Sequence, residues 1–115
     1  MAVLFATCRE VGPVTIVDLS GKISLGEGSA LLRKTIRGLL EEGQTRILLN
    51  LGDVNYIDSS GLGELVSAFT TAKNQGAQVK LLGLTKKVKD VLQLTKLYTV
   101  FDIFDDEAGG ITSFK

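Results

Sequence analysis

One short segment carries most of the reactive side chains that could serve a function in this sequence. In chain order its residues are Asp58, Ser59, Ser60, Gly61, Leu62 and Gly63. We expect Ser59 to be the N-cap of a helix, with Ser60 and Gly61 in its first turn. The free N–H groups and the positive dipole end of that helix would then lie beside the Ser59 hydroxyl. Such a position suits a phosphoryl group that is attached and later removed.

A phosphate on Ser59 would bring about −1.5 to −2 charges and three acceptor oxygens. The helix terminus would favour this charge, whereas the carboxylate of Asp58 would repel it. Gly61 and Gly63 lack side chains, so other groups can approach the backbone closely there. Serine and glycine are also ordinary capping and turn residues at a helix start, so the residues alone leave both roles open.

The composition excludes several other kinds of chemistry. The chain has no histidine, which excludes Ser-His-Asp and Cys-His catalysis, and its single cysteine, Cys8, excludes the common zinc sites. We expect Cys8 to be a small core residue. No phosphate-binding or dinucleotide-binding glycine motif is complete, so we expect no cofactor and no metal. Lysine plus arginine equals aspartate plus glutamate at 13 each, which argues against nucleic acid as a partner.

The length of 115 residues is typical of one domain, and we expect residues 1–115 to form it. No apolar run approaches the roughly 20 residues that a membrane helix needs. The apolar N-terminus lacks a basic region and ends at Arg9-Glu10, so it predicts a strand and no signal peptide. We therefore expect no membrane association and a cytoplasmic protein.

Periodicity along the chain predicts an α/β domain with the order β-β-α-β-α-β-α-(β)-α. The expected strands are residues 3–10, 14–19, 46–51 and 77–82, with a short one within 98–104. The expected helices begin near 27–29, at Ser59, after Thr85 and at 105–107. Residues 20–22 are expected to break the second strand, and Tyr56 and Ile57 to pack beneath a turn before Ser59. Right-handed crossovers then give a mixed sheet of four or five strands, covered by three or four helices.

The run from Arg46 to Gly63, with its Asp-Ser-Ser-Gly-Leu-Gly core, resembles the signature of the STAS domain family. It is similar in particular to bacterial anti-sigma factor antagonists of the SpoIIAA/RsbV type. The resemblance extends to Val14–Gly21 and to Leu92–Phe101. It implies the fold of that family, a mixed sheet with helices packed against it.

The resemblance also implies a function. In the family, an anti-sigma factor serine kinase phosphorylates the first serine of the motif, here Ser59. The unphosphorylated protein binds the anti-sigma factor and frees the sigma factor. The phosphorylated protein cannot bind, and a phosphatase removes the phosphate and restores the binding form. The implied partner-contact residues are Asp58, Ser60, Gly61, Leu62, Gly63, Ser24 and Gly26. Ser24 departs from the family, which often carries an acidic residue there.

Two other functions remain open from the sequence. A STAS domain can be an accessory or scaffold, without switching, in a transporter or a stress-sensing complex. A serine hydrolase could use Ser59 with a lysine base, although the Gly-x-Ser-x-Gly elbow is absent. We expect a binding module and no enzyme.

Overall fold

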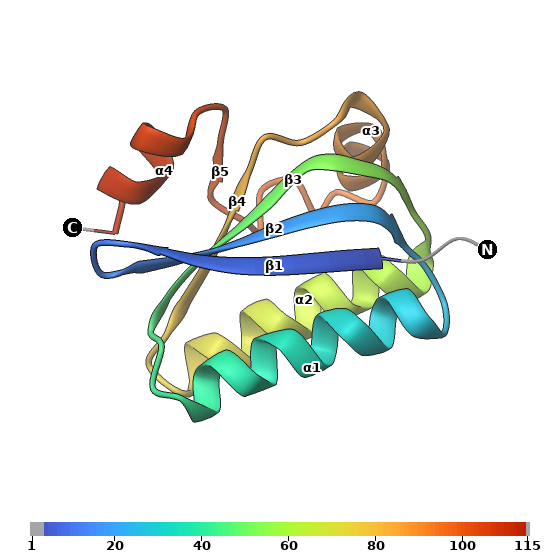
Figure 1. Ribbon diagram of the computed structural model, residues 1–115. Helices are drawn as coiled ribbons and strands as arrows, with labels where there is room; N and C mark the ends of the chain where they lie inside the picture. The colour runs from blue at the N-terminus through green and yellow to red at the C-terminus, as the bar shows by residue number, and fades with distance from the viewer. Residues whose placement is uncertain (1–3, 115) are drawn as a thin grey trace.

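The computed structural model describes residues 4–114 and contains the elements in the predicted order (Figure 1). Val3, the first residue of the first predicted strand, lies outside the described residues. The elements are β1 (Leu4–Val11), β2 (Val14–Ile23), α1 (Glu27–Glu41), β3 (Arg46–Ile57), α2 (Ser59–Asn74), β4 (Gln78–Leu82), α3 (Lys86–Leu94), β5 (Ile103–Phe104) and α4 (Glu107–Thr112).

The strands form one mixed sheet in the order β1-β2-β3-β4-β5. β1 and β2 form an antiparallel hairpin, and the other neighbouring pairs are parallel. β3 is central, and its alternate residues pack into both faces of the sheet: Leu49 into the larger core and Leu48 into the smaller one. The predicted strand at 46–51 is present, and its continuous apolar run is what a strand covered on both sides requires.

The two faces of the sheet carry different helices. α1 and α2 lie side by side across one face, and α4 covers the other (Figure 1). α3 packs along β3, where the Thr85 hydroxyl caps the helix and donates to the carbonyl of Val54 at 2.8 Å. α2 is the longest helix with 16 residues, and no helix within residues 4–114 is both long and apolar enough to span a bilayer.

Both β2 and β3 are longer than the sequence pattern predicts. β2 continues through residues 20–22 to Ile23, and β3 continues through the expected turn to Ile57. The two extensions pair with each other, with register shifts after Asp18 and Gly21 that indicate bulges. As a result, the ends of both strands reach the start of α2.

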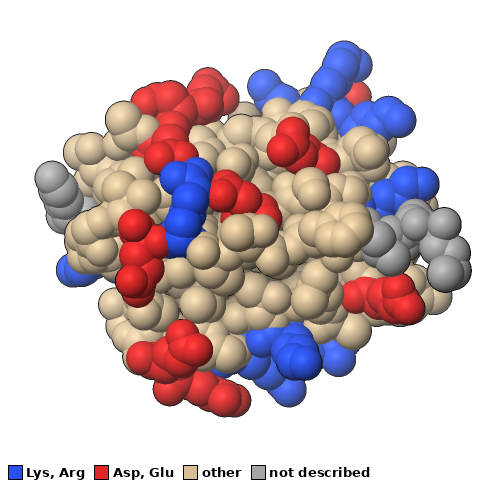
Figure 2. Space-filling view, viewed as in Figure 1, with Lys and Arg blue, Asp and Glu red and all other residues tan. Residues whose placement is uncertain are grey.

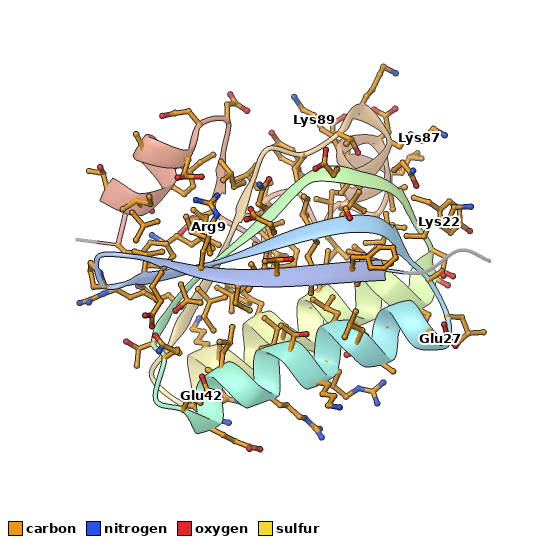
Figure 3. All side chains as sticks on the ribbon, in the orientation of Figure 1. Arg9, Lys22, Glu27, Glu42, Lys87 and Lys89 are labelled. Atoms are coloured by element: carbon orange, nitrogen blue, oxygen red, sulfur yellow. The ribbon has the colours of Figure 1, made fainter. Side chains whose placement is uncertain are left out.

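The face of the sheet that carries α4 also holds a partly exposed polar network between β1, β2, β3 and the start of α4. Arg9 of β1 donates to the carboxylates of Asp18 and Glu107, and the amide of Asn50 donates to Asp18 at 2.8 Å (Figure 3). The guanidinium of Arg9 lowers the pKa of both carboxyl groups. The predicted core position of Cys8 is wrong, because β1 is an edge strand and the Cys8 side chain is exposed.

Candidate functional site

The first turn of α2 follows directly from the end of β3, but its N-cap is Asp58 and not Ser59. Asp58 has extended backbone angles, and its Oδ1 accepts the N–H of Gly61 at 2.9 Å. Ser59 is therefore the first helical residue. Its side chain is exposed and its hydroxyl makes no hydrogen bond to any residue from 4 to 114.

The carboxylate of Asp58 also holds the loop that leads into α1. Its Oδ2 accepts the N–H of Leu25 at 3.0 Å, while its own N–H donates to the carbonyl of Ile23 at 3.3 Å. Both carboxylate oxygens are thus engaged, one on each side of the site. Segments more than 30 residues apart in sequence become one unit through a single side chain.

A second link joins the two helices at the same end. The Ser29 hydroxyl lies 3.1 Å from the Ser60 hydroxyl and donates to the carbonyl of Ser24 at 2.9 Å. Ser29 is buried, and Ser60 is half-buried. The two adjacent serines of the motif therefore differ: the Ser60 hydroxyl helps to pack the two helices together, whereas the Ser59 hydroxyl is exposed and has no hydrogen-bond partner within residues 4–114.

Close backbone packing forms the floor of the site. A Cβ atom added at Gly61 would lie 2.0 Å from the carbonyl oxygen of Ile23, and one added at Gly28 would lie 2.6 Å from that of Lys22. The end of β2 is thus held between the first turns of α1 and α2. Glycine is required at these positions because any side chain would collide with main-chain atoms.

The structure brings most of the predicted contact residues together, but it gives two of them a different role. Ser24 and Gly26 lie in the loop that Asp58 holds, and Gly63 is exposed one turn into α2. Leu62 has only 6 % of its surface exposed and lies in the main core. Gly61 is buried as well. Burial removes both residues from the contact surface and makes them packing residues.

Two apolar side chains near Ser59 are exposed at the surface, which the sequence did not predict. Leu25 is 79 % exposed in the loop held by Asp58. Tyr56 was expected to pack beneath the site, but 44 % of it is exposed; only Ile57 is buried. The sequence contained one indication that Leu25 is exposed: it is a single leucine between a polar residue and a glycine, in Ser24-Leu25-Gly26.

The electrostatics of the site centre on Asp58. Backbone N–H groups of Gly61 and Leu25 donate to this carboxylate and lower its pKa. Asp58 therefore stays ionised at neutral pH and neutralises part of the positive end of α2. Among the described residues, no cluster of histidine, cysteine and acidic side chains could hold a metal ion.

Asp58→Ala should lower the free energy of unfolding by about 1 to 2 kcal/mol, because it removes an N-cap bond and leaves the Leu25 N–H without its acceptor. Urea denaturation measures the loss. Asp106→Ala is the matched control, since Asp106 caps α4 through Gly109 alone and should cost less. An equal cost for both variants would show that the bond to Leu25 adds nothing.

The same carboxylate gives a pH dependence with a definite sign. Its pKa in the folded protein lies below the ordinary value of 3.8, so its contribution to stability is present above that value. The contribution is lost as the pH falls through the pKa of the folded state. The stability gap between the wild type and Asp58→Asn should therefore shrink between pH 5 and about pH 2. A gap that stays constant over this range would contradict the assignment.

Comparisons with known proteins agree with this geometry. The model of the STAS domain family matches residues 6–109. The anti-sigma-B factor antagonist of Bacillus subtilis is 33 % identical over 95 residues, which covers 83 % of this chain and 85 % of that protein.

Solved structures share the fold. A protein of Thermotoga maritima assigned as an anti-sigma factor antagonist superposes with a TM-score of 0.83 at 27 % identity, covering 94 % of this chain and 92 % of that one. Part of the murine anion transporter Slc26a9 superposes with a TM-score of 0.74 at 16 % identity, covering 90 % of this chain but 18 % of the transporter. With its family match, its sheet order and its Asp-Ser-Ser-Gly-Leu-Gly helix start, the chain belongs to the STAS domain family.

Proposed function

We propose that this chain is an anti-sigma factor antagonist that is switched by phosphorylation of Ser59. In the unphosphorylated state it binds an anti-sigma factor, which is also a serine kinase, and so releases a sigma factor. Phosphorylation of Ser59 by that kinase ends the binding, and a phosphatase restores it. The role is that of a cytoplasmic binding module without catalytic activity of its own.

The exposed hydroxyl of Ser59 is the observation that carries this proposal. It lies on the first turn of α2 and has no hydrogen-bond partner among residues 4–114, whereas the neighbouring Ser60 hydroxyl faces Ser29. A kinase can therefore reach Ser59 without unfolding the domain. The family match and the Bacillus subtilis relative support the same role.

A phosphate at Ser59 would change the surface with little change of shape. The carboxylate of Asp58 already occupies the N–H groups of Gly61 and Leu25, so it competes with the phosphate for the helix terminus. The added negative charge would then remain at the surface. A docking protein would meet a charged group where it previously met a small hydroxyl.

The likeness to the transporter domain keeps a second function in view. STAS domains of transporters share this fold, so the fold alone does not separate a switched antagonist from an accessory domain without a switch. Phosphorylation is the property that separates them. An accessory domain would remain in a stable complex and would carry no phosphate on Ser59.

Incubation with ATP and the small serine-kinase-type ATPases of the same genome tests the proposal. We expect one phosphate per chain, located on Ser59 by mass spectrometry. Ser59→Ala should abolish it, whereas Ser60→Ala should keep it, because the Ser60 hydroxyl is engaged with Ser29. Phosphate on another residue, or none with any of these kinases, would refute the proposed switch.

A further inference from the structure

The positive charges of this protein are unevenly distributed although its net charge is zero. Lysines from β2 and from the start of α3 lie along one end of the molecule, where β2 and β3 finish (Figures 2 and 3). We call this group the lysine corner; it consists of Lys22, Lys86, Lys87 and Lys89. The position of the α3 lysines beside the end of β2 depends on the tertiary fold and is not visible from the sequence.

Most lysines of the lysine corner form no ion pair within residues 4–114. Lys86 pairs with Asp90 at 3.3 Å. Within residues 4–114, Lys22, Lys87 and Lys89 form no ion pair, although Asp53 pairs with Ser20 of β2 in the sheet and the N–H of Asp58 contacts the carbonyl of Ile23. The three unpaired ammonium groups therefore keep their charge available to another molecule.

The lysine corner adjoins Ser59 through two exposed apolar side chains. Lys22 is opposite Tyr56 in the sheet, and its Nζ lies 5.6 Å from the centre of the Tyr56 ring. One residue further along the same two strands, Ile23 is opposite Ile57, and Asp58 then binds the N–H of Leu25. Exposed aromatic and aliphatic side chains surrounded by charged ones are typical of protein interfaces.

We propose that the lysine corner, together with Tyr56 and Leu25, is a docking surface for an acidic face of the protein that recognises Ser59. This inference rests on the function proposed above. The surface fits another protein better than a membrane or a nucleic acid. Asp53, Asp58 and Asp90 lie among the lysines, and a uniformly anionic surface would repel them, whereas a protein can place acidic and neutral groups to match.

The variant Lys87→Glu with Lys89→Glu tests the proposal without weakening the fold, because acidic residues near the start of a helix favour its dipole. The control is Lys34→Glu with Arg46→Glu, which makes the same change of net charge on α1 and at the far end of β3. The probe is the kinase that phosphorylates Ser59, and surface plasmon resonance measures its association rate.

We expect the corner variant to associate about tenfold more slowly at low salt, and the control to change less than twofold. The difference should fade near 0.5 M salt, where charges are screened beyond about 4 Å. Equal losses in both variants, or no loss in either, would overturn the docking surface. The phosphorylation of Ser59 would still stand in that case.

A second probe is independent of any kinase. A polyglutamate peptide of about 20 residues, added to the ¹⁵N-labelled protein at low salt, should shift the amide signals of residues 22, 56 and 86–89. Equal shifts around Lys34 and Arg46 would overturn the proposal even if Ser59 is phosphorylated. Lysine-dependent binding to phosphatidylserine vesicles would also overturn it, by assigning the corner to a membrane.

Discussion

Gly61→Ala is expected to lower the free energy of unfolding by about 3 kcal/mol or more, the upper range for overpacking a filled site. The new Cβ would lie 2.0 Å from the carbonyl oxygen of Ile23 and 2.7 Å from its Cγ2. Main-chain oxygen cannot rotate away as a flexible side chain can. The first turn of α2 must therefore move from the end of β2, which also stretches the hydrogen bond from Asp58 to Ile23.

Gly63→Ala is the matched control for this experiment. Gly63 lies two residues later in the same helix, and a Cβ there would meet nothing within 4 Å. Since alanine is the better helix former, this variant should gain up to about 1 kcal/mol. Urea denaturation of both variants gives the comparison. If both substitutions changed the free energy of unfolding equally, the close packing of Gly61 against Ile23 would be contradicted.

Ser59→Asp is expected to weaken binding to the anti-sigma factor kinase by about a hundredfold, because one misplaced charge at an interface costs several kcal/mol. Ser59→Ala should bind as tightly as the unphosphorylated wild type and should stay bound when ATP is added. Neither substitution should harm the fold: Ser59 is exposed, and an acidic residue in the first turn of α2 favours the helix dipole. Isothermal titration calorimetry measures both affinities.

Ser67→Asp supplies the control for charge alone. Ser67 is exposed on α2 two turns beyond Ser59, so the same substitution there adds the same charge away from the helix start. We expect its affinity to remain within about threefold of the wild type, as for a screened charge at a distance. Tight binding by Ser59→Asp would contradict the proposed switch. Equal losses of affinity in Ser59→Asp and Ser67→Asp would show that the weaker binding comes from net charge alone.

The order of elements could be predicted from the sequence because α1, α2, α3 and most strands carry their own periodic pattern, and acidic residues mark the start of α4. The long end of β3 could not. Gly52, Asp53 and Asn55 are poor strand formers, and by local preference they indicate a turn. They are extended because the bulged end of β2 pairs with them, as Ser20 does with Asp53. Such pairing depends on contacts across 30 residues of sequence, which local patterns do not contain.

The start of α2 was predicted at the right segment, but its N-cap was assigned to Ser59 instead of Asp58. Asp58 and Ser59 are both good N-cap residues, and their local sequence does not choose between them. The choice follows from Asp58 having a second acceptor oxygen that binds Leu25, a contact between distant segments. Likewise, the alternation of β1 predicts which residues share a side with Cys8, but not that the helices leave this part of the edge strand uncovered.

The two hydrogen bonds that the Asp58 carboxylate accepts affect how the binding specificity of one such domain could be transferred to another. Three kinds of contact hold two segments together, residues 22–29 and 56–61. They are the hydrogen bonds of one carboxylate, one pair of hydroxyl groups and two close glycine contacts. If only one of these segments were grafted into a related domain, its groups would lack the hydrogen-bond and packing partners that the other segment supplies. An exchange of specificity between such domains therefore requires both segments to be transferred together, although they are far apart in the sequence.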